Sequence, residues 1–129
     1  MKTEYDKLFA TGTIRRIKRD IVLEASSDVM YLCHVQAQLE RDGAADASTS
    51  AAFMIRLPTE LLDNGLCQLA KFATPPGSTT AVRGSRQELI RAIEIQVAAR
   101  NSDPFESFLE TTPLGEQWVP RYKALIDEL

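Results

Sequence analysis

The segment from Ala92 to Ala99 constrains the fold most, because apolar and polar side chains alternate along it. In an extended chain, Ile93, Ile95 and Val97 would lie on one side and the polar residues on the other, which is the period of a half-buried β-strand. A helix from Ser85 to Arg100 would instead gather Leu89, Ile90, Ile93 and Val97 on one face. The strand is the preferred interpretation, and the helix is the alternative.

The stretches before this segment add four strands and one helix to the prediction. Residues 8–19 alternate in part and are rich in β-branched side chains, and residues 29–39 alternate more clearly. The run Phe53 to Leu57 reads as a strand that ends at Pro58, which cannot donate to a strand ladder. Apolar residues then recur at helical spacing from Thr59 to Phe72, and residues 78–82 read as a strand that stops at Gly84. Residues 41–50 lack periodicity and are predicted to be a loop.

This order defines a fold class. Five strands with a helix between the third and the fourth describe a mainly β protein, the five-stranded oligonucleotide/oligosaccharide-binding barrel, or OB-fold. The barrel would occupy residues 1–100. Residues 101–129 are predicted to form a short helical extension, because Asn101 to Pro104 is a helix-start signal and apolar residues recur at helical spacing from Trp118 onward.

Three short motifs carry a resemblance to a known family. They are Leu8-Phe9-Ala10-Thr11-Gly12-Thr13-Ile14, Phe53-Met54-Ile55-Arg56-Leu57 with Leu61-Leu62 after it, and Pro76-Gly77-Ser78-Thr79-Thr80-Ala81-Val82-Arg83-Gly84. The chain resembles the single-stranded-DNA-binding protein superfamily, and within it the primosomal replication protein B branch and small OB proteins of plasmids and integrative elements. The resemblance implies non-enzymatic binding of single-stranded DNA in replication, recombination or transfer. It also places Phe53 where the family often has an aromatic residue that stacks on a base. The chain departs from the family in ending Asp127-Glu128-Leu129 rather than in an acidic tail closed by an aromatic residue.

Single-strand binding needs cations for phosphates and aromatic faces for bases. Phe53 could instead be a core residue. The cations could instead lie on solvated strand faces and in solvated loops without contacting phosphates. The candidate nucleic-acid-binding residues in the predicted elements are Arg15, Arg16, Lys18, Arg19, Phe53, Arg56, Arg83, Arg86 and Arg91.

Composition limits the remaining classes. The 129 residues suffice for one domain with its own core, no run is apolar enough to span a membrane, and the first residues lack a secretion signal, so a cytoplasmic protein is expected. Fifteen basic against 18 acidic residues give a net charge of -3, which argues against an overall basic surface for duplex DNA. Cys33 and Cys67 are predicted to be buried thiols rather than a disulfide or a metal site. The only histidine, His34, is predicted to be an exposed strand residue.

No arrangement typical of catalysis, cofactor binding or metal binding is present in the sequence, so a binding protein without a cofactor or metal is expected. One rival is a ribbon-helix-helix regulator of duplex DNA, with Ile55 to Pro58 as the ribbon and two helices after it. Another is a barrel that binds only proteins, because fold does not fix function. Small barrels offer few nucleotides of groove, so a homodimer or homotetramer is predicted, with single-stranded DNA and replication or conjugation proteins as partners.

Overall fold

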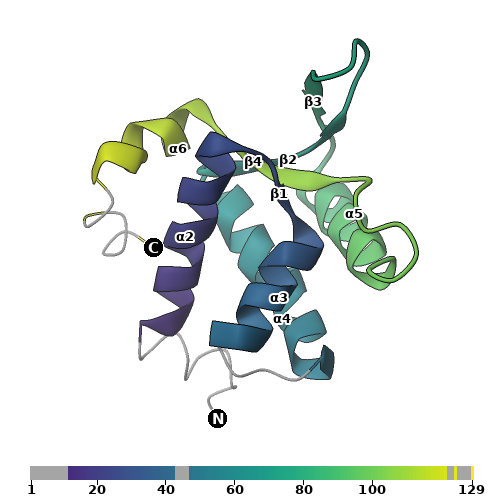
Figure 1. The fold of residues 1–129 in the computed structure, drawn as a ribbon, viewed down its shortest axis with the longest axis horizontal. Coiled ribbons are helices and arrows are strands. Elements are labelled where there is room, and N and C mark those ends of the chain that lie inside the picture. The colour runs from purple at the N-terminus through teal and green to yellow at the C-terminus, as the bar shows by residue number, and fades with distance from the viewer. Residues whose placement is uncertain (1–11, 43–46, 122–123, 125–128) are drawn as a thin grey trace.

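Three helices packed against one side of a small antiparallel sheet form the centre of this protein, as a computed structural model shows (Figure 1). The structure describes residues 12–42, 47–121, 124 and 129. In chain order the elements are α2 (Thr13–Ser27), β1 (Met30–Tyr31), α3 (Leu32–Asp42), α4 (Ala47–Asp63), β2 (Cys67–Phe72), β3 (Thr79–Ala81), α5 (Arg86–Ala98), β4 (Phe108–Thr111), α6 (Pro113–Trp118) and the 3-10 turn η1 (Val119–Arg121).

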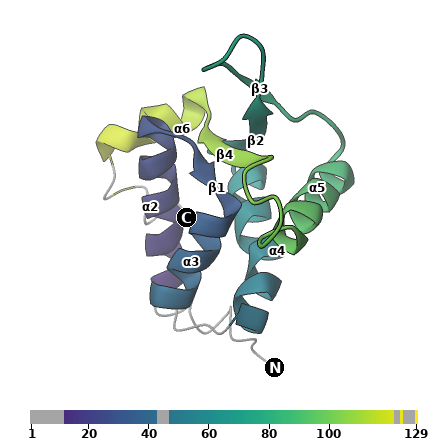
Figure 2. The same cartoon turned by 45° about the vertical axis from the view of Figure 1, so that its right-hand side comes forward.

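The sheet has the order β1-β4-β2-β3, and every neighbouring pair is antiparallel. The last strand in the sequence, β4, therefore lies between β1 and β2. Leu109 of β4 is paired with Met30 on one side and with Leu69 on the other. The β2–β3 hairpin projects away from the helices, and β1 runs directly into α3 (Figure 2).

The predicted OB-fold is wrong, because the described residues form an open four-stranded sheet packed by helices rather than a five-stranded closed barrel. The first two predicted strands are mostly helical. From residue 13 onward the first is α2, in which Ile14, Ile17 and Ile21 are buried at helical spacing, whereas residues 1–11 lie outside the described part. The second keeps only two strand residues before α3 begins at Leu32.

The predicted third strand is a helix in the structure, and the second half of the helix predicted after it is a strand. Residues 53–58 belong to α4, which continues through Pro58 to Asp63, and the predicted helix of residues 59–72 contains β2 in its second half. Pro58 removes one helical hydrogen bond, yet α4 stays in place because Met54, Leu57 and Leu61 are fully buried on it. Burial of the apolar face outweighs the break that proline signals in a sequence.

The decisive segment, residues 92–99, is part of helix α5, so the preferred strand is wrong and the alternative helix is confirmed. Ser85 accepts a hydrogen bond from the Glu88 amide and the Glu88 side chain accepts one from the Ser85 amide, which closes a capping box at the helix start. Of the alternating residues, Ile93 is buried whereas Ile95 is 54% exposed. The buried residues of α5 are Ile93 and Gln96, which are three positions apart as expected for a helix, and not two apart as in a strand.

Of two further predictions, for residues 78–82 and for residues 101–129, the first is confirmed and the second is wrong in part. Strand β3 confirms the strand predicted at residues 78–82. The helical extension predicted for residues 101–129 is wrong as a separate unit, because β4 lies in the middle of the sheet. Helix α6 and η1 do follow it, and the rest of the predicted terminal helix lies largely outside the described residues.

Gly115 fixes α6 against the loop before β2 and provides a test of the fold. A Cβ atom at this position would overlap the backbone oxygen of Leu66 and lie 2.5 Å from Cγ2 of Thr111. Alanine is better than glycine by about 1 kcal/mol inside an unconstrained helix, but overpacking against backbone costs about 2 kcal/mol or more. We therefore expect Gly115→Ala to lower the free energy of unfolding measured in urea, with exposed Gln117→Ala in the same helix as the neutral control. A gain in stability on Gly115→Ala would contradict this packing.

Candidate functional site

The predicted nucleic-acid-binding residues are distributed over three helices and the segment that follows β3. Arg15, Arg16, Lys18 and Arg19 are on α2, Phe53 and Arg56 are on α4, Arg83 follows β3, and Arg86 and Arg91 are on α5. Phe53 is only 7% exposed and belongs to the core, so its ring has no free face for a base in this structure.

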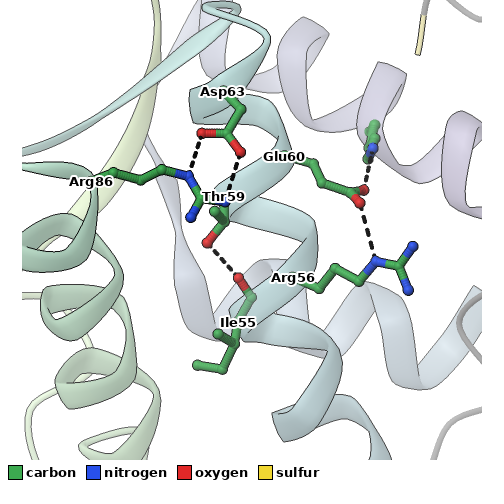
Figure 3. Close-up of polar contacts among 7 residues, drawn as sticks. Ile55, Arg56, Thr59, Glu60, Asp63 and Arg86 are labelled. Carbon is green, nitrogen blue, oxygen red and sulfur yellow. Dashed lines mark hydrogen bonds and ion pairs between the residues drawn. The ribbon is translucent and has the colours of Figure 1, made fainter.

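Most of these cations lie against carboxylates. Arg56 donates to Glu60 at 3.1 Å, and Arg86 donates through two nitrogens to Asp63, each at 3.0 Å (Figure 3). The pairing raises the pKa of Arg86 and lowers the pKa of Asp63, each chiefly through the hydrogen bonds between them. The remaining pairs are Lys18 with Glu60, Arg19 with Asp20 and Arg91 with Glu94. A phosphate would therefore have to compete with an acidic side chain for each of these groups.

A different set of side chains gathers on the face of the sheet that points away from the core. Leu69 and Leu109 are paired across β2 and β4 and belong to the hydrophobic core. Side chains alternate along a strand, so Ala70, Phe72 and Phe108 must lie on the opposite face. Figures 1 and 2 show α2, α3 and α4 on the core side of this sheet.

The opposite face carries four aromatic rings that contact one another, which we call the aromatic face: Tyr31, Phe72, Phe105 and Phe108. Phe108 is fully buried beneath its neighbours, with its ring centroid 4.8 Å from Phe72 and 5.8 Å from Tyr31. The ring centroid of Phe105 lies 4.7 Å from that of Tyr31. Phe72 and Phe105 are 53% and 51% exposed, so an apolar surface is presented to the surroundings on a packed base of other rings.

Polar side chains of β2, β3 and β4 form hydrogen bonds with one another beside the rings. The carboxylate of Glu110 on β4 accepts hydrogen bonds from the Gln68 amide at 2.6 Å and from the Thr79 hydroxyl at 2.8 Å. These bonds connect β4 with the hairpin strands on both sides of the turn. A carboxylate is thereby held close to the rings.

The aromatic face continues into a groove of about 500 Å³ between α2 and α3, which we call the α2–α3 groove. His34 joins the two surfaces, because its ring lies 5.5 Å from Tyr31, edge to face, and also lines the groove. The groove is lined by Asp20, Leu23, Glu24, Met30, His34, Ala37, Gln38, Arg41 and Asp42.

Two of the three groove carboxylates have protein partners. Asp20 accepts from Arg19 at 2.7 Å and from Gln38 at 3.3 Å. Asp42 accepts from Arg41 at 2.9 Å, and this hydrogen bond is the main reason why the pKa of Asp42 is lowered. Within the described part of the chain, Glu24 has no ion pair, and its side chain is exposed. The groove thus holds two carboxylates that are paired with arginine side chains and one, Glu24, that is exposed.

The described residues offer little basis for metal binding or for thiol chemistry. No group of three or more His, Cys, Asp or Glu side chains among them could hold a metal ion. Both cysteines are free thiols, and burial raises the pKa of Cys67 to about 12, which keeps it protonated. In the same part of the chain, no helix is both long and apolar enough to cross a membrane.

Comparison with protein-family models, with curated proteins and with solved structures found no match for the chain. The site is therefore interpreted from its own geometry. Sequence reasoning missed the aromatic face because Phe72 was placed at the end of a helix and Phe105 and Phe108 on another helix. Recognition of 67–72 and 108–111 as neighbouring strands would have been needed to find it.

Proposed function

We propose that this protein is a non-enzymatic interaction module that binds a partner protein through the aromatic face. The observation that carries the proposal is the exposure of Phe72 and Phe105 by about half, on a base of buried Phe108 and half-buried Tyr31. Aromatic side chains are enriched at protein interfaces, and a few rings held in a packed setting commonly supply most of the binding energy. Holding the rings in place also reduces the entropy that binding would cost.

The surrounding charges favour a protein over single-stranded DNA as the partner. Glu110 lies beside the rings, the adjoining groove holds three carboxylates, and the net charge of the chain is -3. Polyanion binding depends on cations that replace condensed counterions, whereas Arg56, Arg86 and Arg91 lie in ion pairs on α4 and α5. Single-strand binding stays a prediction, and the test below includes it as an outcome.

Recognition of duplex DNA by the central helices has less support than binding of single-stranded DNA. The ribbon predicted at Ile55 to Pro58 is part of α4, so the ribbon-helix-helix arrangement is wrong. Helix α4 itself lies between α3 and α5 and exposes only Ala52, Arg56 and Asp63 from residue 50 onward. A recognition helix needs a whole face free to enter the major groove.

The proposal is tested by selecting ligands for the whole chain from a random peptide library displayed on phage. Selected peptides should bind the unmodified protein and lose at least about 30-fold in affinity on combined Phe72→Ala and Phe105→Ala, which corresponds to the loss of one hot spot. The matched control is Leu114→Ala on α6, where another exposed apolar side chain is removed away from the rings. Affinity is measured by fluorescence polarisation, and folding of each variant by circular dichroism.

Fluorescent poly-dT is titrated in parallel at low salt. Saturable binding of poly-dT that the double phenylalanine variant loses would replace the proposal with single-strand binding. Peptides that bind the variant and the unmodified protein equally would contradict the aromatic face as the binding surface. Light scattering tests the predicted homodimer or homotetramer. An oligomer of the unmodified protein that dissociates in the double phenylalanine variant would identify the partner as a second copy of the chain.

A further inference from the structure

We infer that the α2–α3 groove receives a cationic segment of the partner, with lysine or arginine side chains next to apolar ones. This inference rests on the proposed function and specifies the chemistry of the partner. The groove and the aromatic face meet at His34, whose ring contacts Tyr31 and also lines the groove. A chain anchored on the rings can therefore continue into the groove.

The lining of the groove combines apolar and acidic side chains. Leu23, Met30 and Ala37 supply apolar surface, while Asp20, Glu24 and Asp42 supply carboxylates. A lysine or arginine side chain matches this combination, because its aliphatic stem packs on apolar surface and its charged end reaches toward water. The volume of about 500 Å³ is within the range of sites that enclose a small ligand, so the groove has room for a few side chains.

The charge balance of the groove selects the sign of the occupant. Two guanidiniums accompany the three carboxylates: that of Arg19 is paired with Asp20, and that of Arg41, whose side chain is 73% exposed, is paired with Asp42. The carboxylates thus exceed the guanidiniums by one. His34 is the remaining titratable group of the lining. An exposed pair of this kind contributes little stability, so an incoming cation can take the place of Arg41 at Asp42. Glu24 offers a second carboxylate that is exposed.

The inference predicts the composition of the selected peptides. Phage selection on the unmodified protein should enrich sequences in which lysine or arginine follows or precedes aromatic and aliphatic residues. Their affinity should fall as salt is raised, because exposed charges are screened. Combined Glu24→Lys and Asp42→Lys should weaken these peptides at least about tenfold, since like charges would then face each other in the groove.

The matched control is Glu94→Lys on α5, which changes the net charge in the same direction at an exposed position on a different helix. It should change affinity by less than about twofold, in line with a charge far from the contact. Glu24→Gln provides a second variant that removes charge without adding any, so the test stands if the charge-reversed protein fails to fold. It should weaken the basic peptides by a smaller factor in the same direction.

The outcomes separate this inference from the proposed function. Peptides without basic residues, or basic peptides that bind the groove variants as tightly as the unmodified protein, would overturn the inference. If such peptides still lose affinity on Phe72→Ala and Phe105→Ala, the aromatic face remains the binding surface and only the groove assignment fails. If neither set of variants loses affinity, both the inference and the proposed function fail.

Discussion

Leu109→Ala is expected to lower the free energy of unfolding by about 3 kcal/mol, the middle of the range for removing a fully buried leucine side chain. Leu109 has no exposed surface and is paired with Met30 on one side and with Leu69 on the other. Its side chain is thus surrounded in the middle of the sheet, where the neighbours cannot collapse into the space that alanine leaves. Urea unfolding followed by circular dichroism measures the loss.

Ile95→Ala is the matched control for this experiment. Ile95 is 54% exposed on α5, so truncation should change stability by less than about 0.5 kcal/mol. The two predictions would exchange places if residues 92–99 were the central strand of a barrel and residues 101–129 a peripheral helix. A loss at Ile95 larger than the loss at Leu109 would therefore contradict the fold described above.

The sequence contained the correct helix at residues 85–100, but as the second choice. Ile93, Ile95 and Val97 satisfy a strand period, and only the helix-start chemistry of Ser85 and Glu88 distinguishes the two readings locally. A capping box is a short-range signal that acts before tertiary packing is known. Weighting it above three alternating residues would have reversed the interpretation of this segment.

The β-branched residues of α2 and the proline of α4 led to the prediction of strands where the protein forms helices. Pro58 and the isoleucines of α2 have unfavourable or modest helix propensity, yet both helices form because burial of an apolar face exceeds those local penalties. Burial of that kind depends on contacts between segments far apart in the sequence. Propensity alone could not have predicted which helix would be central.

The candidate site was the least predictable part, because it is assembled from distant segments. Tyr31 comes from β1, Phe72 from β2, and Phe108 from β4, and β4 pairs with both other strands only in the folded sheet. The pairing register was not available from a sequence in which residues 67–72 and 108–111 were interpreted as helices. Aromatic residues therefore could be counted in advance but not placed on a common face.

The second large effect concerns Lys18, which was predicted to contact phosphates and is instead buried. Its ammonium lies 2.6 Å from Glu60, its side chain is only 3% exposed, and Glu60 also accepts from Arg56. Glu60→Ala would leave the Lys18 charge buried without this carboxylate, and we expect a loss of about 3 kcal/mol in the free energy of unfolding. Lys18→Met removes the charge and keeps most of the side-chain volume, so it should cost less than about 1 kcal/mol.

The asymmetry between the two variants is the informative quantity. A surface ion pair would give small and similar losses from either side, because solvent would hydrate whichever charge remained. Urea unfolding of both variants at neutral pH, with Glu94→Ala as an exposed ion-pair control on α5, distinguishes the two situations. Equal small losses would show that Lys18 reaches solvent and restore it as a candidate for binding phosphates. A large loss confined to Glu60→Ala would establish Lys18 as a structural cation that links α2 to α4, with its charge already compensated inside the protein.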